Sequence, residues 1–280
     1  MTSVFLRIAE AHFKSTLAGQ NQPHTMTLHL DFLRRTQAGP ALFTVEDKKL
    51  GRQTSVIHVT LSQESREEVV GYVTNSNMHT EEGVSFSTEY ALRPSPPPVD
   101  LALLAQDRDA EWAAAGSMPF AGFRQATKKT QFYYPRLGQE HPRTADEWIR
   151  FRNGERWTNA TLGYVADMWL MPIESFIARE SAGGAGGAGA IEGGQAVKKR
   201  TANFWYPTVS LNLDIKKPLP EDGVEWLFSR VETKQIKNGR MDLEVVIFDA
   251  TGDIVALSQH VALAVSVQRN LAERKTGAKI

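Results

Sequence analysis

The sequence predicts an α+β fold made of two copies of one unit, each a helix followed by antiparallel strands. Three observations lead to this prediction. The pattern Thr-x-x-Leu-x-Leu-Asp at 25–31 recurs at 208–214, an offset of 183 positions. A Gly-Arg pair at a predicted turn also recurs, at 51–52 and 239–240. Finally, the candidate elements follow each other in the same order in both halves, which indicates an internal duplication.

The amino-acid composition limits the classes of protein to which the chain can belong. The 280 residues are 41% hydrophobic and 23% charged, which is typical of a globular domain. Thirty-two basic and 32 acidic side chains cancel, so no global field attracts the chain to nucleic acid or to an anionic membrane. The absence of cysteine excludes disulfides, thiolate metal sites and a cysteine nucleophile. No apolar run approaches the ~20 residues that span a bilayer.

The N-terminal unit is predicted to cover residues 1–92. Apolar residues at helical spacing indicate an amphipathic helix over 3–17. Residues 25–35 alternate between a polar face, which includes Thr25 and His29, and an apolar face. Further strands are expected at 41–50, 55–63 and 68–74, separated by turn residues.

A proline-rich linker is predicted between the units, over residues 93–117. The stretch RPSPPPVD cannot continue a sheet, because proline has no backbone donor. A short helical stretch is expected near 101–115. The C-terminal unit then covers 118–280.

The C-terminal unit repeats the order of the first. Strands are expected at 128–136 and 147–152, and the longest helical candidate in the chain is 159–180. Pro172 should kink or interrupt this helix. The strand at 207–218 places Thr208 on its polar face and Val209 on its apolar face. Strands at 224–234, 240–249 and 254–267 follow.

Three other motifs are given structural interpretations. The Gly-x-Gly-x-x-Gly at 184–189 follows a helix and leads into a strand, the reverse of a dinucleotide site, so we interpret it as a surface loop. The basic cluster 198–200 could meet a substrate phosphate, but a solvated loop edge is the simpler interpretation. The histidines lack metal-ligand spacing, and we infer neither a metal nor a cofactor.

Three segments resemble the acyl-CoA thioesterase II (TesB-like) family and its fungal thioesterase-like relatives: LGYVADMWLMP (162–172), PTVSLNLDIKKP (207–218) and DIVALSQHVAL (253–263). The resemblance implies a double hotdog fold, in which each sheet wraps around a long helix. It also implies that an aspartate, a threonine and a glutamine position and activate a hydrolytic water. The matching positions are Asp167, Thr208 and His260, with Gln259 as the alternative to His260. A one-residue shift reverses the face of a strand, so both cannot serve.

Asp167 is surrounded by apolar neighbours, so we expect it to be partly buried, which favours a functional role over a solvated surface position. The N-terminal unit has no aspartate in its helix, and we interpret it as a scaffold. Family members usually have an opening strand before their first helix, whereas this chain begins at the helix. That leaves a sheet edge exposed and favours formation of a homo-oligomer.

The resemblance implies hydrolysis of an acyl-CoA or of a carrier-bound acyl or polyketide thioester. Two alternatives remain: a duplicated scaffold that binds such a chain without hydrolysis, and a hotdog dehydratase or cyclase. The C-terminal tripeptide at 278–280, Ala-Lys-Ile, resembles a peroxisomal signal, so the expected location is cytoplasmic or peroxisomal.

Overall fold

The computed structural model describes residues 1–116, 125–181 and 204–266 of the chain. The N-terminal unit holds α1 (Thr2–Ser15), η1 (Ala18–Gln20), β1 (His24–Phe32), β2 (Leu42–Lys49), β3 (Ser55–Gln63) and β4 (Arg66–Ser76). The rest of the chain holds α2 (Leu101–Ala105), β5 (Trp112–Ala114), η2 (Gln125–Lys129), β6 (Thr130–Pro135), β7 (Thr144–Phe151), η3 (Asn159–Thr161), α3 (Leu162–Val165), α4 (Ile173–Ser181), β8 (Phe204–Trp205), β9 (Thr208–Ile215), β10 (Leu227–Glu232), β11 (Ile236–Lys237), β12 (Arg240–Asp249), β13 (Ile254–Leu263) and β14 (Val265–Ser266).

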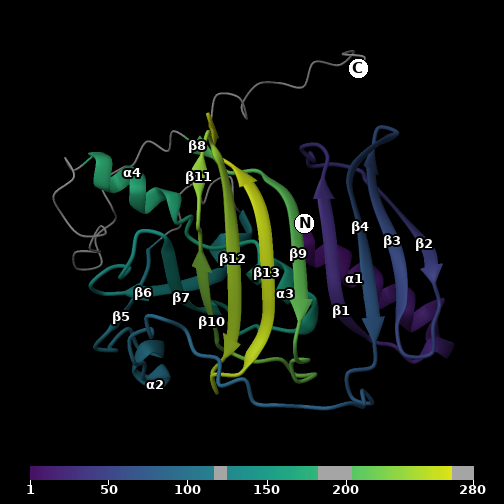
Figure 1. Cartoon of the computed structure of the whole chain (residues 1–280), viewed down its shortest axis with the longest axis horizontal. Helices are drawn as coiled ribbons and strands as arrows, with labels where there is room; N and C mark the ends of the chain where they lie inside the picture. Colours follow the sequence, from purple (N-terminus) through teal and green to yellow (C-terminus); the bar gives the residue numbers. More distant parts are fainter. Residues whose placement is uncertain (117–124, 182–203, 267–280) are drawn as a thin grey trace.

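Twelve of the described strands form one antiparallel sheet, in the order β2-β3-β4-β1-β9-β13-β12-β10-β7-β6-β5, with β11 paired to β12 (Figure 1). The order β2-β3-β4-β1 is mirrored by β10-β12-β13-β9, so the duplication predicted from the sequence is present in the sheet. Beyond β10, the C-terminal unit continues with three more strands. The N-terminal unit ends at β2, whose side chains are largely exposed.

The two repeated strands, β1 and β9, pair with each other and join the units. Leu28 faces Leu213 and Leu30 faces Leu211. Leu28 is equivalent to Leu211 in the repeat, so the pairing across the junction is symmetric. His29 faces Asn212, which is its own counterpart in the repeat, and the two side chains hydrogen-bond through Nδ1 and Oδ1 at 2.7 Å. A pseudo-two-fold axis therefore passes between His29 and Asn212.

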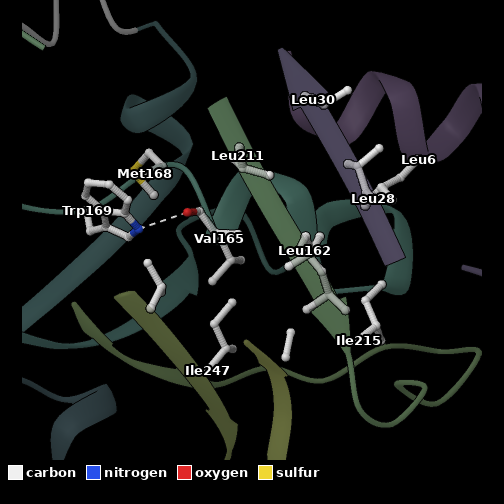
Figure 2. Packing of buried hydrophobic residues seen from close by; sticks show 14 of the residues in the cluster. Leu6, Leu28, Leu30, Leu162, Val165, Met168, Trp169, Leu211, Ile215 and Ile247 are labelled. Atoms are coloured by element: carbon white, nitrogen blue, oxygen red, sulfur yellow. Dashed lines mark hydrogen bonds between the residues drawn. The ribbon is translucent and has the colours of Figure 1, made fainter. Parts of the chain in front are cut away.

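Helix α1 of the N-terminal unit and η3 and α3 of the C-terminal unit lie on the same face of the sheet, where α1 contacts both η3 and α3 (Figure 1). Phe5, Leu6, Ala9 and Phe13 of α1 are buried against the sheet. Gly163 permits the close contact between the helices, because a Cβ there would lie 2.9 Å from the backbone nitrogen of Ser3. The main core lies between this helical layer and the sheet, as Figure 2 shows for Leu28, Leu162 and Leu211, among others.

The single long helix predicted for 159–180 is wrong: the segment forms η3, α3 and α4, with an irregular break over 166–172. The interruption expected at Pro172 is confirmed, since α4 begins directly after it. Met171 is disfavoured in a helix because it precedes proline, and proline is well placed just before a helix. The backbone carbonyl freed at Ala166 accepts a hydrogen bond from Trp169 Nε1 at 3.1 Å (Figure 2). Side-chain partners of this kind satisfy the backbone groups that a break leaves unpaired in a buried segment.

The described part of the stretch expected as a linker, residues 93–116, packs against the C-terminal unit. It holds α2, as expected near 101–115, and β5, which the sequence did not reveal and which pairs with β6. Trp112 Nε1 donates to the carbonyls of Pro97 and Pro98. A second hydrophobic cluster forms on the face of the sheet opposite to α1 and α3. It consists of Leu104, Trp112, Tyr133, Trp148, Trp226 and Phe228.

Three interpreted motifs, the glycine motif 184–189, the basic cluster 198–200 and the C-terminal tripeptide 278–280, lie outside the described residues. In the described part of the chain, none of the helices has the length and apolar character needed to cross a bilayer.

Candidate functional site

An open pocket of about 630 Å³ lies where the start of β9 meets the break between α3 and α4. Asp167 and Thr208 both line it, so the structure brings together two of the residues expected to act together. The remaining wall is largely apolar and aromatic, and it includes Phe32, Tyr164, Met168, Trp169, Met171, Trp205 and Tyr206. Such a wall suits the hydrocarbon part of a substrate.

Thr208 reaches this pocket because of a β-bulge. On β13, Val261 and Ala262 are adjacent, but their partners on β9 are Ser210 and Thr208, which leaves Val209 as the extra residue. A bulge of one residue reverses the alternation that precedes it. The prediction that Thr208 shares the polar face of Ser210 is therefore wrong: Thr208 lies on the face that contacts the helices. Val209 is instead 40% exposed.

The Asp167 carboxylate is half-buried at the break after α3 and is held by two hydroxyls. Thr208 Oγ1 donates to Oδ1 at 3.3 Å, and Thr2 Oγ1 donates to Oδ2 at 3.4 Å. The backbone N–H of Asp167 donates to the carbonyl of Tyr164. Thr2 is the first residue of α1, so the carboxylate lies beside the N-terminus of a 14-residue helix, whose dipole favours negative charge.

His260 lies on β13, facing Leu211 of β9, and is only 4% exposed. Burial lowers the pKa of His260, although the nearby Asp167 carboxylate and Ala166 carbonyl act in the opposite direction. The imidazole is therefore neutral at pH 7. Its ring packs edge-on against Trp169, at 5.4 Å between centroids, and is not among the described residues that line the pocket.

The hydrogen bonds around His260 assign its tautomer. Ser258 Oγ donates its only hydrogen to the carbonyl of Asn212 at 2.7 Å, so it accepts from His260 Nε2–H at 2.9 Å. Nδ1 is then the unprotonated nitrogen, and it is buried with no hydrogen-bond partner among the residues that the structure describes. A buried acceptor of this kind is costly unless a water or a ligand meets it.

Gln259, the alternative to His260, is exposed and faces Glu244 of β12 on the opposite side of the sheet. The buried face of β13 therefore carries His260, and Gln259 is turned away from Asp167. Sequence reasoning missed Thr2 and Ser258. Thr2 is 165 positions from Asp167 and carried no motif, and the Ser258 contact depends on the neighbouring strand.

A second pocket, of about 760 Å³, lies in the N-terminal unit at the position that the pseudo-two-fold axis relates to the first pocket. Leu6, Arg7 and Glu10 line it with the spacing that Gly163, Tyr164 and Asp167 have in the first pocket. Thr25, the counterpart of Thr208, also lines it and also precedes a bulge.

The chemistry of the second pocket differs, however. Glu10 is paired with Lys14 at 2.5 Å, and the Thr25 hydroxyl donates to Asn75 at 3.0 Å. The residue facing Leu28 is Val73, where the other unit has His260 facing Leu211. The arrangement of carboxylate, threonine and imidazole is thus found on one side of the axis.

Within residues 1–116, 125–181 and 204–266 there is no group of histidine or acidic side chains arranged to hold a metal.

Comparison with known proteins agrees with this architecture. Residues 1–76 match the acyl-CoA thioesterase N-terminal domain, and residues 93–264 match the acyl-CoA thioesterase C-terminal domain. The thioesterase-like protein TwmA of Talaromyces wortmannii is 36% identical over 289 residues, covering 94% of this chain and 83% of that protein.

Solved structures show the fold. The acyl-CoA thioesterase II TesB2 of Mycobacterium marinum superposes with a TM-score of 0.59 at 16% identity, covering 95% of this chain and 90% of that one. A conserved protein with a hot dog fold from Alicyclobacillus acidocaldarius gives 0.62 at 14% identity, covering 87% and 79%. The expected double hotdog is confirmed. With both domain models matched in order along the chain, this protein belongs to the acyl-CoA thioesterase family.

Proposed function

We propose that the protein hydrolyses a thioester, of CoA or of a carrier-bound acyl or polyketide chain, through a water activated by Asp167. The observation that carries the proposal is the carboxylate itself. It is held by threonine hydroxyls from two different units at the wall of an apolar pocket. Fixing both carboxylate oxygens orients their remaining lone pairs toward the pocket, where a water can be held and deprotonated.

The reaction then follows from the chemistry of a thioester. The water oxygen attacks the carbonyl carbon while Asp167 takes its proton, which gives a tetrahedral oxyanion. Collapse of this intermediate breaks the C–S bond, the thiolate leaves, and the proton returns from Asp167 to the sulfur. A thiolate leaves readily, so no protein nucleophile is needed. The positive end of the α1 dipole, beside Thr2, favours the negative charge that develops.

His260 is proposed to hold the same water through Nδ1. This nitrogen is buried without a partner in the described part of the chain, and the neutral imidazole can accept an O–H hydrogen bond there. This role matches the one that the family resemblance gives to a glutamine, whose side-chain oxygen also accepts. His260 would act as the second acceptor, with Asp167 as the base.

Thiol release from a panel of acyl-CoAs tests the proposal. Wild type should release CoA, and Asp167→Asn, which is nearly isosteric, should lower kcat by about 10²–10⁴-fold, the range of general-base assistance. Thermal melting controls for the fold, because the half-buried carboxamide should leave Tm close to that of wild type. Equal rates for two folded proteins would rule out the role of Asp167.

A second candidate is removal of water from a 3-hydroxyacyl thioester. The observation that favours it is the neutral imidazole with a bare nitrogen beside a carboxylate, since such a pair can remove a proton next to a carbonyl. Mass spectrometry of a 3-hydroxyacyl-CoA incubated with the protein separates the two candidates. Hydrolysis gives the free acid and CoA, whereas dehydration gives a CoA ester lighter by one water.

A further inference from the structure

We propose that Glu147 is a positioning residue for the candidate site: its buried carboxyl holds the break at 166–172 in the arrangement that directs Asp167 into the pocket. The inference rests on the proposed function and adds a regulation to it, because loss of the Glu147 proton would release the break and lower turnover. Glu147 is not among the described residues that line the Asp167 pocket, so its effect on the reaction is indirect.

Glu147 occupies a core position of the sheet. Alternation along β7 turns it to the same side as Ala145 and Ile149, which belong to the main core. Its partner on β10 is Ser229, whose hydroxyl donates to Glu147 Oε1 at 3.2 Å, and both side chains are fully buried. A carboxyl is costly to bury in an apolar core, so its presence at this position points to a role other than packing.

The Glu147 carboxyl contacts the break directly. It accepts a hydrogen bond from the backbone N–H of Leu170, a group that the interrupted helix leaves without a helical partner. The neighbouring residue, Trp169, donates to the carbonyl of Ala166 at 3.1 Å. The bond from Leu170 to Glu147 therefore ties the sheet to the same few residues whose backbone sets the position of Asp167.

The other carboxyl oxygen of Glu147 makes the contact sensitive to ionisation. Oε2 is buried and has no hydrogen-bond partner among the described residues. A neutral carboxyl can carry its proton on this oxygen, whereas an ionised one would leave an unsolvated negative charge there. Burial accordingly raises the pKa of Glu147 to about 8. Above that pH the charge favours entry of water beside Leu170, which loosens the break.

In the described part of the chain, no basic side chain is bonded to Glu147 to offset this charge. Tyr134 of β6 and Ser229 of β10 donate hydrogen bonds to the carboxyl, and the break contributes a backbone N–H. Asp146, the neighbour on β7, raises the pKa of Glu147 by repulsion; its own carboxylate is paired with Arg230 on the opposite face of the sheet. The groups around Glu147 therefore stabilise a carboxyl without supplying a counter-charge.

The N-terminal unit provides an internal comparison. The position equivalent to Asp167 is Glu10, and the positions equivalent to the break are 9–15, where α1 stays helical as far as Ser15. This unit ends at β2, the equivalent of β10, and none of the described strands pairs beyond it in place of β7. The buried glutamate and the break therefore occur together, in the unit that carries the candidate site.

The test measures kcat for thiol release between about pH 6.5 and pH 9, with the uncatalysed hydrolysis subtracted. In wild type kcat should fall about fivefold from pH 8 to pH 9 as Glu147 ionises. Glu147→Gln keeps the acceptor for Leu170 and cannot ionise, so its kcat should stay within a few-fold of wild type at pH 7 and show no alkaline fall. Glu147→Leu should lower kcat about tenfold at every pH and leave KM unchanged, because the acceptor is lost and the pocket wall is intact.

Two further variants separate this effect from a loss of stability. Ser229→Ala removes a hydrogen bond that lowers the pKa of Glu147, so the alkaline fall should move to higher pH. Asp109→Asn is the matched control, because it changes another buried carboxyl, which accepts from the backbone N–H groups of Asp100 and Trp112. It should lower Tm and leave the alkaline fall at the same pH as in wild type. A fall that persists in folded Glu147→Gln would overturn the inference.

Trp169 provides a readout that needs no turnover. Its indole N–H is bonded to Ala166 beside Asp167, so the NMR signal of that proton should titrate at about pH 8 in wild type and stay constant in Glu147→Gln. Trp169→Phe identifies the signal among those of the six tryptophans. Titration of this signal without thiol release from any acyl-CoA would support the hold of Glu147 on the break and contradict the proposed hydrolysis. Thiol release with a signal that does not respond to pH would support the hydrolysis and overturn the inference.

Discussion

Thr208 donates a hydrogen bond to Asp167 from the face of β9 opposite to the one that strict alternation would give it. Val209 is the unpaired residue of the bulge that makes this contact available. The bulge also occurs in the N-terminal unit, where Met26 is the extra residue before Thr27. The feature therefore belongs to the duplicated unit, and the C-terminal copy uses it to aim a hydroxyl at a carboxylate.

We predict that Thr208→Val lowers kcat about tenfold, whereas Thr208→Ser stays within a few-fold of wild type. Valine keeps the shape but leaves one carboxylate oxygen without its donor, a loss of about 1–3 kcal/mol. Serine keeps the hydroxyl. Steady-state thiol release measures both, and circular dichroism melting checks the fold. An equal loss in the two variants would contradict a role for the hydrogen bond.

Thr2 should behave in the same way from the other side of the carboxylate. Its hydroxyl meets Oδ2 at 3.4 Å, so Thr2→Val should also lower kcat, and Thr2→Ser should restore most of it. In combination with Asp167→Asn, each threonine variant should cost less than it does alone, because both threonines act through the Asp167 carboxylate. Strictly additive losses in the double variants would show that the residues act separately.

We predict that kcat decreases at acidic pH because His260 becomes protonated. Burial lowers the pKa of His260 below its usual 6.5, so Nδ1 is available above that lowered pKa and is lost as the pH falls through it. The same shift makes the fold less stable as the pH falls below 6.5, because the unfolded chain binds the proton more readily. His260→Gln should keep an acceptor and remove this decrease, while His260→Ala should lower kcat at every pH. A decrease that persists in a folded His260→Gln variant would assign the titration to another group.

Glu147 should make the protein less stable as the pH rises. Its carboxyl is fully buried on β7, and burial raises its pKa to about 8. Hydrogen bonds from Ser229 and from the backbone of Leu170 lower the pKa without overcoming burial. Between about pH 4.5, the usual pKa of a glutamate, and about pH 8, the folded chain keeps a proton that the unfolded chain has released, so stability falls across that window.

Glu147→Gln is the variant that tests this effect. It keeps the shape and cannot ionise, so its Tm should exceed that of wild type at about pH 8 and approach it at about pH 5. Melting curves across this range measure the difference. A constant offset between the two proteins at every pH would exclude the titration of Glu147 as the cause.

The sequence by itself determined the duplication, the order of the elements, and the segments that carry Asp167, Thr208 and His260. These follow from local periodicity and from short motifs, because side-chain alternation and turns depend on residues that are neighbours in the sequence. The alternation of the strand 254–267 was also predictable, but it places Gln259 with Leu257 and Val261 and His260 with Ser258, so it was the family resemblance that favoured His260, and the structure buries the face that carries it.

Only the tertiary structure decided how these segments act together. The bulge at Val209 depends on the pairing of β9 with β13, the break at 166–172 depends on partners such as Trp169 and Glu147, and the contact of Thr2 with Asp167 joins residues 165 positions apart. The placement of Glu147 opposite Ser229 likewise follows from the pairing of β7 with β10. Local patterns specify faces and turns, but register between distant strands and contact between helices are set by packing and hydrogen bonding across the whole fold, which no single stretch of sequence contains.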